Sequence, residues 1–84
     1  MEIGDIVISR AGHDKNSAFV VVATVNDEFV LIADGKGRGM DKPKLKRIKH
    51  LRAVGKSDVK NPTNATLKKC IKQFISDRRT YAEK

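Results

Sequence analysis

Hydrophobic residues in the first third of the chain fall into three runs separated by short polar segments. A run rich in β-branched residues occupies positions 3–9, and nearly continuous apolar runs occupy positions 18–25 and 29–33. The turn formers of residues 11–17 separate the first two runs, and Asn26-Asp27-Glu28 separates the last two and favours a tight hairpin. The pattern predicts antiparallel strands. Their lack of clean alternation indicates burial on both faces, as when a small sheet curls into a barrel.

The middle of the chain follows neither strand nor helix periodicity. Residues 34–39 are rich in glycine and predict a mobile basic loop that ends at Pro43, which cannot donate a hydrogen bond to a sheet. Residues 44–52 place three large apolar side chains three positions apart. We predict a short, bulged or bent strand there, and the alternative is a single 3₁₀-like turn.

The C-terminal part has helical periodicity. Residues 53–63 have the composition of a linker, and Asn64 or Thr63 can cap the helix that follows them. Its apolar stripe consists of Leu67, Cys70, Ile71, Phe74 and Ile75. A helix of this length is marginal in water by itself, so it must dock on the barrel, on another copy or on a partner, and the sequence leaves this choice open.

Charge is strongly segregated along the 84 residues. Residues 36–84 carry sixteen Lys and Arg against four acidic residues, whereas residues 1–35 carry two against six. Such segregation favours a surface that meets a polyanion, and nucleic acid is the first candidate. The single cysteine, Cys70, excludes an internal disulfide and fits a reducing cytosol. No apolar stretch approaches the roughly 18 residues of a membrane-spanning helix, so we expect a cytoplasmic protein that does not enter membranes.

Three segments resemble the KOW motif of ribosomal proteins and NusG transcription factors. GDIVISRAGHDK, at residues 4–15, combines a strand, a glycine turn and basic residues, although Asn16 and Ser17 stand where a glycine commonly precedes the next strand. VLIADGK and PKLKRIKHL are similar to KOW ribosomal proteins of archaeal and eukaryotic large subunits and to short bacterial KOW proteins. The resemblance extends to about residue 52. It implies a mainly β fold, with a small SH3-like barrel that contacts RNA.

We therefore expect a barrel over residues 1–54, a linker over 55–63, an amphipathic α-helix over 64–79 and a tail over 80–84. The resemblance also implies a first RNA-contacting group in the loop after the first strand. Gly12 matches the glycine that turns this loop, and Arg10, His13 and Lys15 fall on its exposed side. The alternative is that Gly12 only turns a hairpin and that the charged side chains of the loop are solvated.

A second group follows from the residues themselves. Eight cations stand in seventeen positions with Asp41 as the only acid, and His50 lies among them; the cations are Lys36, Arg38, Lys42, Lys44, Lys46, Arg47, Lys49 and Arg52. Long, flexible cations suit RNA phosphates, and Arg adds bidentate contacts or stacking. Because Leu45, Ile48 and Leu51 are interleaved with the cations, we expect them to tie the stretch to the core as an organised patch, not a solvated surface run.

Other chemistry receives little support. The two histidines lack a third metal ligand and a nucleophile at motif spacing, and the glycines match no nucleotide-binding loop, so we expect no catalysis, metal or cofactor. All three Phe lie in apolar patterns, which favours structured RNA, above all ribosomal RNA, over single strands.

Two rival functions stay open. The alternative to RNA binding is a protein-interaction module of the ribosome or transcription machinery that docks through the barrel or through the helix around Phe74. A membrane-surface role would rest on Lys68, Lys69, Lys72 and Arg79, but the helix lacks Trp, so we expect only slight membrane affinity.

Overall fold

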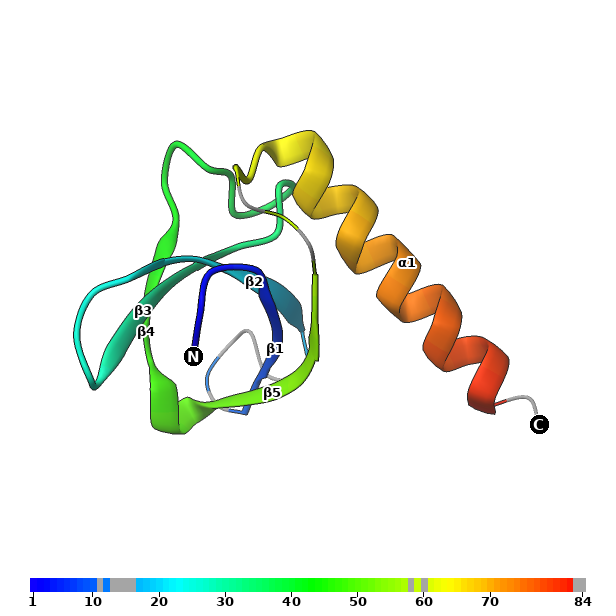
Figure 1. Cartoon of the computed structure of the whole chain (residues 1–84), viewed down its shortest axis with the longest axis horizontal. Coiled ribbons are helices and arrows are strands. Elements are labelled where there is room, and N and C mark those ends of the chain that lie inside the picture. Colours follow the sequence, from blue (N-terminus) through cyan, green and yellow to red (C-terminus); the bar gives the residue numbers. More distant parts are fainter. Residues whose placement is uncertain (11, 13–16, 58, 60, 83–84) are drawn as a thin grey trace.

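The computed structural model describes residues 1–10, 12, 17–57, 59 and 61–82, the last six by their backbone only. Five strands are followed by one long helix (Figure 1). The elements are β1 (Asp5–Ser9), β2 (Ala18–Thr24), β3 (Phe29–Ala33), β4 (Lys44–Arg47), the 3₁₀ turn η1 (Ile48–His50), β5 (Leu51–Lys56) and α1 (Asn64–Ala82).

The strands form one antiparallel sheet in the order β4-β3-β2-β1-β5. Its two edge strands, β4 and β5, are consecutive in the chain and joined by η1, so the sheet curls until its edges approach each other at that turn (Figure 1). Among the described residues no ladder joins β4 to β5, and the sheet is not closed. The predicted fold class, mainly β with a C-terminal helix, is confirmed as an open, curled sheet.

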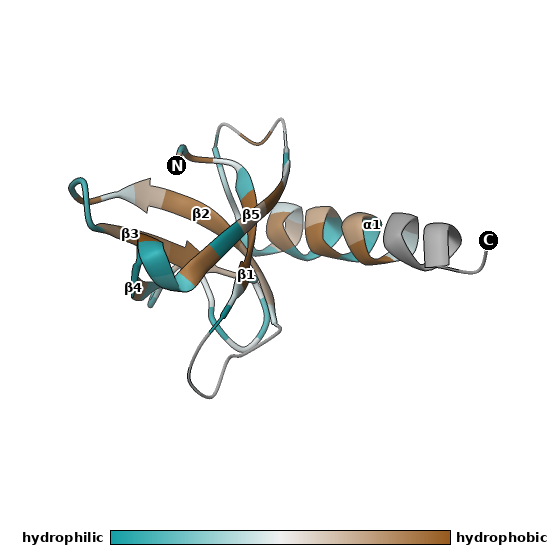
Figure 2. Cartoon of the chain, turned by 90° about the horizontal axis from the view of Figure 1, so that it is seen from below, coloured by the Kyte–Doolittle hydropathy of each residue, from teal (hydrophilic) through white to brown (hydrophobic). Residues whose placement is uncertain are grey.

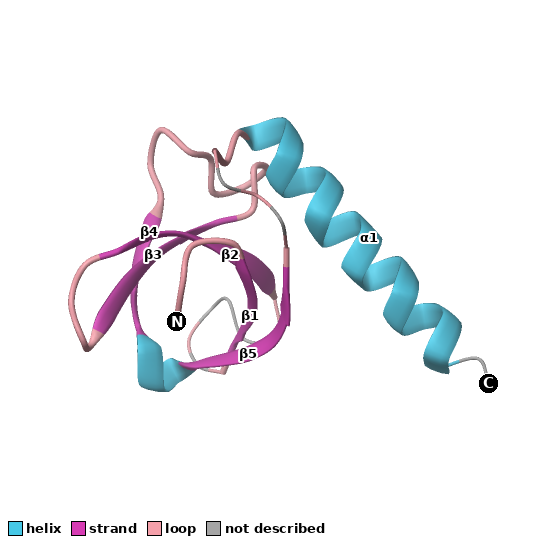
Figure 3. Ribbon diagram, in the orientation of Figure 1, coloured by secondary structure: helices cyan, strands magenta, loops and turns pink. Residues whose placement is uncertain are grey.

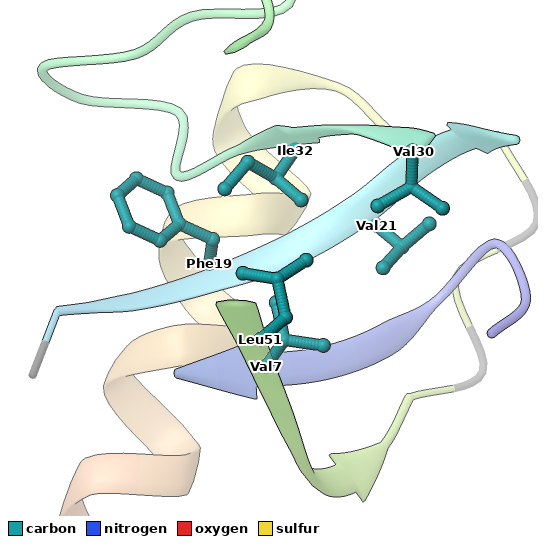
Figure 4. Packing of buried hydrophobic residues seen from close by; sticks show 6 residues of the cluster. All are labelled: Val7, Phe19, Val21, Val30, Ile32 and Leu51. Atoms are coloured by element: carbon teal, nitrogen blue, oxygen red, sulfur yellow. The ribbon is translucent and has the colours of Figure 1, made fainter. Parts of the chain in front are cut away.

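The concave side of the sheet holds the first core. Alternate residues of the strands point into it, and Figure 4 shows the six side chains that fill it: Val7, Phe19, Val21, Val30, Ile32 and Leu51. All six are at most 5% exposed. Ile48 of η1 packs against them, so the turn that joins the two edges also covers one end of this core.

The convex side is buried under the helix. Ile6, Val20, Val22 and Ala33 form a second cluster with Leu67 of α1, and Ile71 and Phe74 pack against it. The sequence pattern indicated burial on both faces but attributed it to curling alone; here the outer face is covered by α1. The helix therefore docks on the sheet of its own chain, which answers the question that the sequence left open. Its C-terminal half extends past the sheet (Figure 1), and Ile75 is 46% exposed.

Three boundaries differ from the sequence prediction. Residues 44–52 form a strand, a 3₁₀ turn and the start of a second strand, so the single bent strand was wrong and the alternative turn is present between two strands. Strand β5 continues to Lys56, two residues beyond the predicted end of the barrel, because a bulge at Val54 lets Gly55 pair with Ile6. Helix α1 continues to Ala82, three residues beyond its predicted end.

The helix begins with a reciprocal cap. The backbone N–H of Thr63 donates to Oγ1 of Thr66 at 2.8 Å, and the N–H of Thr66 donates to Oγ1 of Thr63 at 3.2 Å. These are the two bonds of a capping box, with Thr in place of the more frequent Glu at its last position. Thr63 is thus the capping residue, and the side chain of Asn64 is released for a different contact.

Thr63→Ala should lower the free energy of unfolding by about 1 kcal/mol, within a range of about 0.5 to 2, because it removes the acceptor for an N–H of the first turn. Urea denaturation followed by helical circular dichroism measures the change. Thr24→Ala, at an exposed strand end, is the control and should stay within about 0.5 kcal/mol. Equal stability of the two variants would contradict the capping role.

Candidate nucleic-acid interface

Edge strand β4 presents cations on both of its faces. Lys44 and Lys46 stand opposite Ile32 and Val30, whose side chains fill the inner core, so these two lysines lie on the inner side of the sheet and are half-buried. Arg47 stands opposite Phe29 on the outer side, and its guanidinium carbon lies 5.2 Å from the centre of the Phe29 ring. This cation–π contact orients an otherwise exposed arginine.

The start of the first loop lies against the end of β4 and η1. The N–H of Arg10 donates to the carbonyl oxygen of His50 at 2.8 Å. Gly12 has a φ of 78°, and a Cβ placed on it would lie 3.7 Å from Nζ of Lys46. Two groups that are far apart in the sequence, the first loop and the basic stretch, therefore meet at this end of the curled sheet.

Exposed cations continue around the turn. Arg10, Lys49, His50 and Arg52 are all exposed. Figure 2 shows the turn between β4 and β5 as largely hydrophilic, in contrast to the hydrophobic β2 and β3. The hairpin between β2 and β3, which carries Asp27 and Glu28, borders this region on one side. The N–H of Ile48 donates to the carbonyl oxygen of Glu28 at 2.8 Å. That hairpin is itself held by Asn26, whose Oδ1 accepts from the N–H groups of Glu28 and Phe29.

The loop between β3 and β4 brings further cations to the other end of β4. Oδ1 of Asp34 accepts hydrogen bonds from the N–H groups of Lys36 and Arg38, at 2.9 and 2.8 Å, and the N–H groups of Asp34 and Gly35 donate to the carbonyl oxygen of Arg38. A network of hydrogen bonds thus gives residues 34–38 a defined turn within the loop that the sequence predicts to be mobile. The side chains of Lys36, Arg38 and Lys42 are exposed.

Strand β4 connects these two regions. From Lys44 to Arg47 it spans three residue steps, about 10 Å. We call the whole surface the basic strip; its members are Arg10, Lys36, Arg38, Lys42, Lys44, Lys46, Arg47, Lys49, His50 and Arg52. It follows the β3–β4 loop, the edge strand and η1. A strip of this kind can neutralise several phosphates along one nucleic-acid backbone.

Two of the residues predicted from the sequence, His13 and Lys15, lie outside the described residues. Of the three apolar residues expected to tie the basic stretch to the core, Leu51 is buried and Ile48 half-buried, whereas Leu45 is 54% exposed. The expectation for Leu45 was wrong, because its side chain is on the outer face of an edge strand that has no neighbour on one side.

Three residues that shape the strip were missed by reasoning from the sequence. Phe29 supports Arg47, Asp34 organises the β3–β4 loop, and Asn64 contacts that loop from the helix. The Asp34-Gly35 pair is a recognisable turn signal. The other two contacts depend on strand register and helix docking, which no local pattern reveals.

The described residues contain no group of three or more His, Cys, Asp or Glu side chains placed to hold a metal ion. Within the same part of the chain, no helix has the length and apolar character needed to cross a bilayer. No family model matches the sequence, and a search of curated proteins found no significant match.

Proposed function

We propose that this protein binds structured RNA, above all ribosomal RNA, through phosphate contacts from the basic strip, in a non-catalytic, cytoplasmic role. The observation that carries the proposal is the contact of the first loop with β4 and η1, at Arg10–His50 and Gly12–Lys46. It brings Arg10 of the first loop beside the cations of β4 and η1. The resemblance of the same segments to KOW proteins supports this assignment independently of the geometry.

The aromatic residues favour structured RNA over single strands. Phe19 is 3% exposed, Phe29 is half-buried beneath Arg47, and Phe74 of α1 is half-buried against the cluster on the convex face of the sheet. All three side chains are at least half-buried, whereas single-strand binders stack bases on exposed aromatic rings. This surface therefore favours binding to a folded RNA through its backbone and shape.

A purely structural explanation accounts for only part of the strip. Lysines on an edge strand discourage unwanted pairing with other strands, and Lys44 and Lys46 fit that role. It does not require cations in the β3–β4 loop or in η1, where Lys36, Arg38 and Lys49 are exposed outside the strands.

Binding to an RNA hairpin should depend steeply on salt. Seven Lys and Arg of the strip are exposed: Arg10, Lys36, Arg38, Lys42, Arg47, Lys49 and Arg52. If about six of them displace counterions, the affinity should fall roughly a thousandfold between about 50 and about 200 mM salt. Filter binding across this range measures the slope. Affinity that does not change with salt would contradict phosphate contacts as the source of binding.

One observation favours a second candidate, a protein-interaction module. Leu45 is 54% exposed on an edge strand, where an extended segment of another protein could pair with β4. A pull-down with and without nuclease treatment separates the two functions. Partners that are lost after nuclease support RNA binding, whereas partners that remain support protein docking.

A further inference from the structure

The β3–β4 loop and the start of α1 form one packed unit. Oδ1 of Asn64 accepts a hydrogen bond from the N–H of Met40 at 2.8 Å. Met40 is half-buried and packs in the same cluster as Leu67 of the helix. Figure 3 shows the loop beside the first turn of α1, so residues far apart in the sequence hold each other at this point.

The glycines of the loop permit this close approach. Gly35 is buried with a φ of 77°, and a Cβ placed on it would overlap the backbone carbonyl oxygen of Asn64. A Cβ on Gly39 would lie 2.7 Å from Oδ1 of Asp41 and 3.4 Å from Oδ1 of Asn64. Gly35 therefore permits close contact with the start of the helix, and Gly39 leaves room for the side chains of Asp41 and Asn64.

The cations of the loop depend on that shape. Asp34 holds the backbone of Lys36 and Arg38 by accepting from the N–H groups of both residues. The N–H of Lys42 donates to the carbonyl oxygen of Gly39 at 3.2 Å. The Met40–Asn64 bond lies in the same short segment, between the Asp34 turn and Lys42. Its loss removes a restraint on the loop without changing any charge.

We propose that Asn64 is a positioning residue for RNA binding: by accepting from Met40 it latches the basic β3–β4 loop to helix α1 and keeps Lys36, Arg38 and Lys42 aligned with β4. The inference rests on the proposed RNA-binding function. It assigns the helix a part in binding although the helix need not touch RNA. Because a loop ordered in advance loses less entropy on binding, the latch raises affinity.

Asn64→Ala should weaken binding to an RNA hairpin by about three- to tenfold, the effect of one lost hydrogen bond. It should also speed hydrogen exchange at the Met40 amide. Asn64→Asp keeps a side-chain oxygen as the acceptor and should restore slow exchange at the Met40 amide. Asn61→Ala removes an exposed asparagine from the linker and should bind like the wild type.

The effect of Asn64→Ala is next measured in two variants, each with a different group of cations changed to Gln. This comparison distinguishes positioning of the loop from a general loss of stability. With Lys36, Arg38 and Lys42 all changed to Gln, Asn64→Ala should cause no further loss, because the loop no longer contributes charge. With Arg47, Lys49 and Arg52 changed to Gln, its full effect should persist. Equal losses in both backgrounds would overturn the latch, as would wild-type affinity in Asn64→Ala.

The failure of the proposed function looks different. A wild-type chain that binds no RNA hairpin overturns RNA binding and the positioning role together, before any variant is compared. Met40 amide exchange then still decides whether Asn64 holds the loop. Unchanged exchange in Asn64→Ala would overturn the latch itself.

Discussion

Changing Arg47, Lys49 and Arg52 together to Glu should reduce the affinity for an RNA hairpin by about 100-fold or more. Each substitution removes a charge-assisted contact and adds repulsion from phosphate, so a loss of about 1 kcal/mol per site is a conservative expectation. All three side chains are exposed, and the fold should stay intact. Lys46 is left unchanged because it is half-buried, so its reversal could act through the fold. Filter binding measures the affinity, and circular dichroism checks the fold.

The matched control reverses Lys68, Lys69 and Lys72, which are exposed on the helix. Either triple replacement changes the charge by −6, from +8 to +2, so the two variants have the same net charge and reverse it at different places. The control should lose less than about tenfold, through long-range attraction alone. Equal losses would mean that net charge and not the basic strip drives binding. A larger loss in the control would move the interface to the helix.

Leu67→Ala should have the largest effect on stability, lowering the free energy of unfolding by about 2 to 5 kcal/mol. Leu67 is fully buried and is the helix residue at the centre of the cluster on the convex face, with Val20 and Ala33 of the sheet. Its truncation leaves a cavity between the helix and the sheet. For so small a domain this is a large share of the total stability. Urea denaturation measures it through the midpoint at an unchanged slope.

Ile75→Ala is the control for this prediction, since it removes a similar apolar side chain from the same helix. Ile75 is 46% exposed, so the cost should stay within about 0.5 kcal/mol. If Leu67→Ala were as stable as Ile75→Ala, the helix would not depend on this contact. Other contacts would then have to bury the convex face of the sheet.

The strands and the helix could be predicted because their signals are local. Runs of β-branched residues bounded by turn formers correspond to β1, β2 and β3, and the spacing from Leu67 to Phe74 corresponds to the docked face of α1. The turn η1 was harder, because apolar residues three apart fit a bent strand as well as a 3₁₀ turn. Only the curl of the sheet, which brings both edges to this point, decides between them.

The site was predictable in its composition but not in its assembly. The cations of residues 36–52 are evident in the sequence, whereas the approach of Gly12 to Lys46 results from the curl of the sheet. The support of Arg47 by Phe29 results from strand register. The sequence does not reveal that a glycine of the loop also serves close packing. That use of Gly35 becomes visible only when Asn64 is docked against it.

The central claim is that the basic strip binds structured RNA, and mapping of backbone amide chemical shifts during titration with an RNA hairpin tests it most directly. The largest shifts should occur in the β3–β4 loop, β4, η1 and the start of β5, together with Arg10 of the first loop. Repeating the titration at high salt should abolish them. Shifts confined to the exposed lysine face of α1, or none at all in the basic strip, would contradict the account.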